Sequence, residues 1–147
     1  PDQAKAASEM MRVVRPGGSI ALANWTPESF IGRIFKTLGK YLPPPRGVSS
    51  PALWGTQARL TEFYGDTASD IALHPRSFVF RYRSPDHFMD IFQTYYGPIH
   101  KAFLALDEDG QASLDADLRA LIAEMNTATD GTMAVPAAYV DAVVRKA

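Results

Sequence analysis

Apolar side chains recur at helical spacing in five stretches of this chain. A spacing of three and four residues places such side chains on one face of a helix, and that face then packs against the rest of the protein. Capping residues precede these stretches, for example Asp2 before the first and Thr26-Pro27 before the second. The pattern predicts helices over residues 2–14, 27–38, 56–63, 85–106 and 114–125, the fourth broken at Gly97-Pro98.

Three further stretches predict strands. Ile20–Ala23 is apolar without alternation, which is typical of a strand buried on both faces, as in a parallel sheet. Ser69–Arg83 alternates in two sets of opposite parity, which predicts one strand interrupted near His74-Pro75 or a tight pair of strands. The terminal stretch AAYVDAVVRKA predicts the last strand. Helices that alternate with strands predict an α/β fold, here with a sheet of only about three strands.

Composition and charge narrow the possible functions. The chain has 147 residues, a formal net charge of −1 and no cysteine. The near-neutral charge provides no basic field for nucleic acid or an anionic membrane, and no apolar run has the length of a membrane span. Without cysteine or clustered acids, the spacing of His74, His87 and His100 does not suggest a zinc site. We expect no metal, no nucleic acid and no membrane partner, and a cytoplasmic location.

The stretch EMMRVVRPGGSIALANWTPESFIG, residues 9–32, carries a family likeness. It resembles the second half of class I S-adenosylmethionine-dependent methyltransferases, closest to the ubiquinone/menaquinone-biosynthesis-like group. In that family a helix ending in a Leu-Arg-Pro-Gly-Gly-type turn leads into the fifth strand, and here the turn is Val14–Gly18. The stretches LPPPRGVSSPALWGT, RSPDHFMDIFQTYYGP and VPAAYVDAVVRK also resemble this group, so the likeness covers essentially the whole chain.

The resemblance implies a partial Rossmann-like methyltransferase fold. Residues 1–147 would form the C-terminal part of the domain, with the last three strands of a seven-stranded sheet, a proline-rich loop over 41–55 and an inserted helical cap over 84–128. The family holds S-adenosylmethionine on a Gly-rich loop and an acid that follow the first strands. This chain has neither, because its only Gly-Gly pair, Gly17-Gly18, precedes a strand. We therefore expect the first four strands to be absent and no cofactor-binding residue to lie in this chain.

Five residues are candidates for the acceptor side of such an enzyme. Trp25 follows a buried strand, where open α/β sheets place ligands, although a packed Trp is an equal alternative. Trp54 either closes over a substrate or anchors the proline-rich loop, and anchoring is the favoured role. Tyr95, Tyr96 and His100 form a polar aromatic group on one helix. Tyr96 and His100 are the candidate catalytic residues, with His100 as a general base, although a packed helix with locally bonded tyrosines is the favoured explanation for each residue.

Two functions follow from these observations. The first is a fragment of a methyltransferase that acts on a small-molecule acceptor; this chain supplies the acceptor side and is inactive alone. The second is a non-catalytic binding or oligomerisation module. In either case the strand Ile20–Ala23 would present an unpaired apolar edge, so we expect a homo-oligomer or pairing with the missing N-terminal half. The sequence does not identify the acceptor or the methylated atom.

Overall fold

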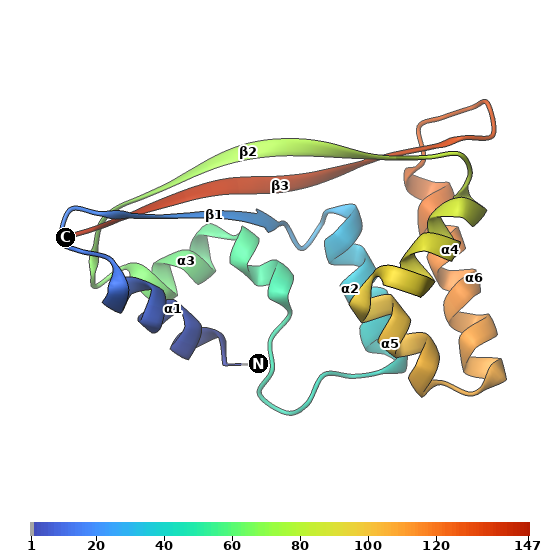
Figure 1. The fold of residues 1–147 in the computed structure, drawn as a ribbon, viewed down its shortest axis with the longest axis horizontal. Coiled ribbons are helices and arrows are strands. Elements are labelled where there is room, and N and C mark those ends of the chain that lie inside the picture. The colour runs from blue at the N-terminus through green and yellow to red at the C-terminus, as the bar shows by residue number, and fades with distance from the viewer. Residues whose placement is uncertain (1) are drawn as a thin grey trace. The chain divides into compact units, whose positions relative to one another are not determined.

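Six α-helices, one 3₁₀ helix and three strands form this chain, as the computed structural model of residues 2–147 shows (Figure 1). In chain order the elements are α1 (Gln3–Val13), β1 (Ser19–Trp25), α2 (Phe30–Tyr41), the 3₁₀ helix η1 (Pro51–Gly55), α3 (Gln57–Tyr64), β2 (Ala68–Tyr82), α4 (Pro85–Tyr95), α5 (Gly97–Ala105), α6 (Glu108–Met125) and β3 (Met133–Lys146). The predicted α/β class and the predicted number of strands are confirmed.

Short polar side chains fix the starts of three helices as the sequence predicts. Asp2, Thr56 and Ser84 each accept a hydrogen bond from the backbone N–H three residues on, at 2.8, 3.2 and 3.1 Å. Pro85 occupies the first turn of α4, and the break predicted at Gly97-Pro98 separates α4 from α5. These capping interactions are local, so they do not depend on the tertiary fold.

The start of α2 differs from the prediction. The sequence indicates Thr26-Pro27, but α2 begins at Phe30 and Ser29 caps it, accepting from the Gly32 N–H at 3.2 Å. The Thr26 N–H instead donates to the Ala138 carbonyl at 3.3 Å. A long-range backbone hydrogen bond to β3 therefore extends the pairing past the end of β1 and delays the helix.

The three strands form one sheet in the order β1-β3-β2 (Figure 1). β1 runs antiparallel to β3, in register from Ser19 opposite Arg145 to Trp25 opposite Tyr139. The predicted burial of β1 on both faces is wrong, because Ala21 and Ala23 are exposed. Residues on the other face, such as Ile20, are covered. Among the described residues β3 is the only strand neighbour of β1.

The residues that were expected to form an interrupted strand or a pair form the single strand β2 of 15 residues. The change of parity along this stretch corresponds to different contacts of the two halves of β2. Ile71 and Leu73 pack against the core of α1, α3 and β1, whereas Phe80 and Tyr82 contact the Phe88 ring of α4 at 5.1–6.4 Å. One strand thus supplies alternate faces to two separate cores.

The chain divides into two compact units. Unit 1 comprises the residues up to Pro27, Pro45–Ser77 and Ala138–Ala147. Its core is formed by buried side chains of α1, β1, α3 and β3: Ala7, Met11, Ile20, Leu60, Tyr64, Ala142 and Val144. Lys146 ties the last strand to α1, because its Nζ donates to the carbonyls of Met11 and Val14 at 2.9 and 2.8 Å.

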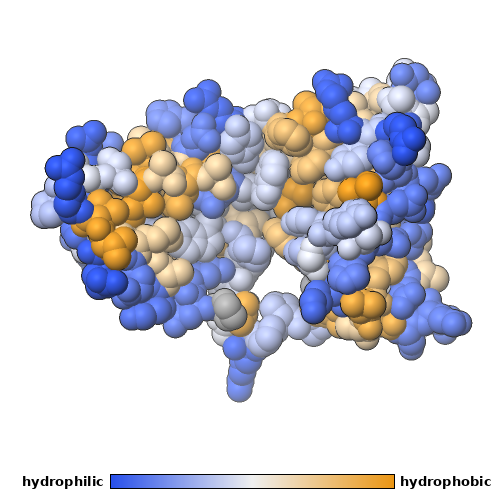
Figure 2. Space-filling view, viewed as in Figure 1, coloured by the Kyte–Doolittle hydropathy of each residue, from blue (hydrophilic) through white to orange (hydrophobic). Residues whose placement is uncertain are grey.

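Unit 2 comprises Glu28–Pro44 and Phe78–Ala137. Its helices bury an apolar stripe each, with Phe30 of α2, Phe88 of α4, Ile99 of α5 and Leu118 of α6 almost fully covered. Figure 2 shows apolar side chains among polar ones on the visible surface of both units. Within residues 2–147 no helix combines the length and the apolar character that crossing a membrane would require.

Candidate functional site

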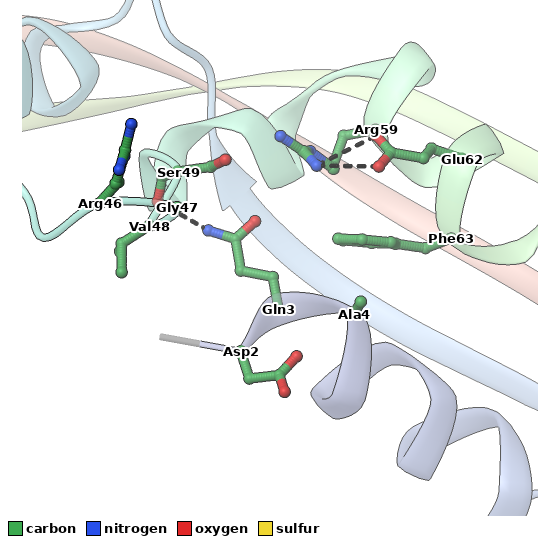
Figure 3. Close-up of a pocket in the computed structure, with 10 residues that line it drawn as sticks. All are labelled: Asp2, Gln3, Ala4, Arg46, Gly47, Val48, Ser49, Arg59, Glu62 and Phe63. Atoms are coloured by element: carbon green, nitrogen blue, oxygen red, sulfur yellow. Dashed lines mark hydrogen bonds and ion pairs between the residues drawn. The ribbon is translucent and has the colours of Figure 1, made fainter.

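A cavity of about 420 Å³ opens in unit 1 beside the first turn of α1 (Figure 3). Its walls come from three segments that are distant in sequence: Asp2–Ala4, residues 46–49 of the proline-rich loop, and the α3 residues Arg59, Glu62 and Phe63. We call it the loop cavity. Its volume lies within the range of sites that bind small molecules, roughly 300–1,000 Å³.

The loop cavity is tied to the carboxyl end of β1 through the proline-rich loop. The Gln3 amide nitrogen donates to the Ser49 carbonyl at 2.9 Å and holds the loop against α1. A few residues later the loop reaches β1, where a Cβ on Gly55 would lie 2.3 Å from the Trp25 carbonyl oxygen. The proline-rich loop thus connects the wall of the loop cavity with the end of β1.

One wall of the loop cavity combines an ion pair with an aromatic ring. Arg59 Nη1 lies 3.1 Å from Glu62 Oε2, and its guanidinium carbon is 5.3 Å from the centre of the Phe63 ring (Figure 3). Phe63 is held from behind by Trp54, whose ring centre is 4.9 Å away. Arg46, on the opposite side, has no hydrogen-bond or ion-pair partner among residues 2–147. The wall thus offers an apolar plane beside fixed charges, a combination that suits a small polar-aromatic ligand.

Two buried amide groups near this end of the sheet lack partners. The Gln3 Oε1 acceptor and the Asn24 Nδ2 donor are both inaccessible, and neither has a hydrogen-bond partner among the described residues. An unpaired buried polar group costs about 1–3 kcal/mol, so each of these two groups favours the binding of a water, an ion or a ligand that supplies its missing partner. Gln3 lines the loop cavity, and Asn24 directly precedes Trp25 at the end of β1.

The two tryptophans predicted as binding residues both lie in unit 1. Trp25 is half-buried at the end of β1, with its ring edge-to-face against its cross-strand neighbour Tyr139 at 5.7 Å. Trp54 packs against the unit 1 core and braces Phe63. This packing agrees with an anchoring role for Trp54 in the proline-rich loop, and Trp25 stays a candidate wall of a binding site.

The other three candidates lie in unit 2. Tyr95 is 78% exposed, so its ring lies in solvent. Tyr96 is half-buried against Phe92 at 4.8 Å, and burial raises the pKa of its phenol. His100 Nδ1 lies 2.8 Å from the Gln93 carbonyl oxygen. If Nδ1–H is the donor, Nε2 is left as the acceptor, which is the tautomer that a general base needs.

The structure therefore separates the predicted site residues into two groups and adds others. Trp25 and Trp54 belong to unit 1, and Tyr95, Tyr96 and His100 to unit 2. The sequence alone does not indicate Gln3, Arg46, Arg59 or Phe63 as site residues, because only the fold brings them to one cavity. Within the part of the chain that the structure describes, no group of three or more His, Asp or Glu side chains has an arrangement that would hold a metal ion.

The chain is similar to several mycobacterial proteins of uncharacterized function. The uncharacterized protein Rv1403c of Mycobacterium tuberculosis and Mb1438c of Mycobacterium bovis are each 34% identical over 128 residues, which is 84% of this chain and 47% of the relative. The uncharacterized protein Rv1405c of Mycobacterium tuberculosis is 31% identical over 135 residues, 90% of this chain and 49% of the relative. No family model matches the chain. The chain thus spans about half the length of the curated relatives it matches.

Proposed function

We propose that this chain is the acceptor-side part of a class I S-adenosylmethionine-dependent methyltransferase that acts on a small molecule. The observation that carries the proposal is the strand arrangement. The sequence resemblance implies that the three strands are the fifth, sixth and seventh of the family sheet, in which the last strand lies antiparallel between its two predecessors. The order β1-β3-β2, with β3 antiparallel to β1, agrees with that arrangement.

The free side of β1 supports the same proposal. Among the described residues β1 pairs with no strand other than β3, and η1 packs against its carboxyl end, so in our proposal a further strand pairs with the rest of its outer edge. A bare edge is costly because it exposes unpaired backbone groups. The mycobacterial relatives are about twice as long as the segment that they share with this chain. In our proposal the remaining strands of the sheet pair with this edge of β1.

In our proposal the cofactor site is completed by residues outside this chain. Gly17-Gly18 closes a turn instead of holding a nucleotide: Gly17 has a φ of 70°, and its N–H donates to the Lys146 carbonyl at 3.2 Å. In our proposal the chain contributes the acceptor side of the enzyme. Positioning the acceptor and excluding water would be the main catalytic tasks of these residues.

In this proposal the candidate catalytic residues are two residues of unit 2. His100 would accept the proton of the acceptor at Nε2 while the Gln93 carbonyl holds Nδ1. Tyr96 would act as a donor, because burial raises the pKa of its phenol and keeps it protonated at neutral pH. Both roles are proposals that mutational kinetics of the complete protein can test.

The test is cofactor binding by the protein translated from the complete reading frame that contains this chain. We expect saturable binding of S-adenosylmethionine and S-adenosylhomocysteine by calorimetry, and none to residues 1–147 alone. Full-length Rv1403c provides a second protein for the same titration. Absence of binding to both full-length proteins would refute the methyltransferase proposal.

A second candidate is a non-catalytic module for binding or oligomerisation. The observation that favours it is the open face of the sheet, where Ala21 and Ala23 of β1 are exposed and Val143 of β3 is only half-buried. A full-length protein that binds no cofactor but forms a stable oligomer through this face would support the module over the enzyme.

A further inference from the structure

A second cavity, of about 390 Å³, lies in unit 2 at the junction of β2 and α4. Its walls are formed by Arg81, Tyr82, Arg83 and His87, together with residues 132–134 at the start of β3. We call it the arginine cavity. No carboxylate lines it, in contrast to the loop cavity, whose lining includes Asp2 and Glu62.

The two arginines of this cavity have no partner among the described residues. No hydrogen bond or ion pair joins the side chain of Arg81 or Arg83 to another residue, and both are exposed. Arg76, on the same strand, behaves differently because its Nε lies 2.9 Å from Asp141 Oδ2. Two adjacent guanidinium groups without a counter-charge repel one another, so an anion between them would be stabilising.

The acids that are closest in sequence are already engaged. Asp86 forms an ion pair with Arg119. Asp130 accepts hydrogen bonds from the Thr132 backbone N–H at 3.0 Å and from its hydroxyl at 2.6 Å, and these bonds lower the pKa of the Asp130 carboxyl. Neither carboxylate forms a bond to the arginines of the cavity, so their positive charge is left for a ligand.

Tyr82 and His87 also contribute polar groups to the lining of the arginine cavity. Burial raises the pKa of Tyr82, so its phenol keeps its proton at neutral pH. The His87 ring packs edge-to-face against Tyr82 at 5.6 Å, and its buried Nδ1 has no hydrogen-bond partner among the described residues. Ser84 fixes the position of His87 by accepting its backbone N–H at 3.1 Å. In our proposal the Tyr82 hydroxyl adds a donor for an oxyanion bound in the cavity.

We propose that the arginine cavity binds an anionic small molecule through a phosphate or carboxylate group held by Arg81 and Arg83. A guanidinium group donates two parallel hydrogen bonds to such an oxyanion. Residues two apart on a strand are about 7 Å apart at Cα, a distance that long side chains close onto one phosphate or span across a diphosphate. The proposal for this site does not depend on the acceptor chemistry proposed above.

The test is calorimetric titration of the protein translated from the complete reading frame with orthophosphate, pyrophosphate and citrate. We expect saturable one-to-one binding of at least one of these anions, and the tightest one identifies phosphate or carboxylate as the bound group. Arg81→Gln and Arg83→Gln should each weaken that binding by about tenfold or more, because each removes a charge-assisted bidentate contact.

The matched control is Arg145→Gln, which removes one positive charge from an exposed, unpaired arginine of β3 in unit 1. It changes the net charge equally but leaves the arginine cavity intact, so it should bind the anions as the unsubstituted protein does. Circular dichroism melts confirm that all three variants fold. Equal weakening of anion binding in Arg145→Gln would show that net charge, and not the arginine cavity, binds the anions, and it would overturn the proposal. The absence of saturable binding to any of the three anions would also overturn it.

Discussion

Gly55 closes η1 directly against the carbonyl of Trp25, so closely that a Cβ on Gly55 would lie 2.3 Å from that oxygen. The neighbouring atoms are backbone atoms of Trp25 and Thr26, which cannot rotate away as a side chain can. The proline-rich loop therefore reaches the carboxyl end of β1 only if this position has no side chain.

Gly55→Ala should accordingly destabilise unit 1 by about 1–3 kcal/mol, because the backbone must shift to admit the methyl group. Urea unfolding monitored by tryptophan fluorescence measures the change. The matched control is Gly39→Ala in α2, where nothing lies within 4 Å of the new Cβ. That change should stabilise the protein by about 0.5–1 kcal/mol through helix propensity. Equal stability of Gly55→Ala and the parent protein would refute the close packing.

Features that short-range interactions determine are predictable from the sequence, whereas features that long-range contacts determine are not. Asp2, Thr56 and Ser84 are predictable as caps because each cap bond spans three residues. The start of α2 is not predictable, because Thr26 is held by Ala138 across the sheet. The alternation of burial in β1 is not predictable for a similar reason. An apolar alanine is compatible with a buried and with an exposed face, so the sequence does not show which face of the strand is covered.

The candidate sites follow the same rule. Trp25 is predictable as the residue at the end of a strand, because strand end and residue are adjacent in the sequence. The loop cavity is not, since Gln3 and Ser49 meet across 46 positions of sequence. The unpaired state of Arg81 and Arg83 also depends on which acids have other partners, and only the tertiary structure reveals that.

Lys146 stabilises the carboxyl end of α1, because its ammonium donates to the carbonyls of Met11 and Val14 at 2.9 and 2.8 Å. These carbonyls have few helix partners and carry the negative end of the helix dipole. Lys146→Met should lower the free energy of unfolding by about 1 kcal/mol, measured by thermal unfolding. Lys101→Met in α5, an exposed lysine, is the control and should change stability little. A loss of equal size in both variants would contradict the capping role.

Acid should weaken unit 2 through two surface carboxyl groups. The hydrogen bonds from Arg33 lower the pKa of Glu124, and those from Lys40 and then Tyr41 lower the pKa of Asp117. Because these pKa values are lower in the folded state, the stabilisation is complete above the unfolded value. It is lost as the pH falls below about 4, the pKa of these groups in the unfolded chain, and then through their lower pKa in the folded protein. Urea midpoints between pH 7 and pH 3 measure this loss.

The variant that tests this acid dependence is Glu124→Gln, because it removes the carboxylate that accepts two hydrogen bonds of 2.6 Å from Arg33. Its urea midpoint should depend less on pH than that of the parent protein, and Arg33→Gln should have the same effect. The double variant should add nothing further, since both changes break one pair. A parent-like acid slope in both single variants would show that the pair does not contribute in solution.

The neighbouring tyrosines Tyr95 and Tyr96 offer a matched pair for the proposed catalytic role of unit 2. Tyr95 is 78% exposed, whereas Tyr96 is half-buried one turn before His100. In the complete protein, His100→Gln should lower the rate of S-adenosylhomocysteine formation about 100-fold, because a general base contributes at least that much. Tyr96→Phe should lower it less, and Tyr95→Phe should leave it unchanged. Parent-like turnover in His100→Gln would remove His100 from the mechanism.

The unpaired side of β1 predicts that residues 1–147 associate when they are produced alone. β1 has only β3 as a strand neighbour among the described residues, and its exposed face carries the small apolar side chains Ala21 and Ala23. A strand edge of this kind pairs with another chain unless a charge blocks it, and lysine is the residue that natural edges use most. Sedimentation at micromolar concentration should therefore show dimers or larger species, and Ala23→Lys should shift them toward monomer. Ala58→Lys, on the exposed side of α3, adds the same charge away from the sheet and should leave the association unchanged. A monomeric parent chain would mean that the edge of β1 is protected in solution without a partner strand.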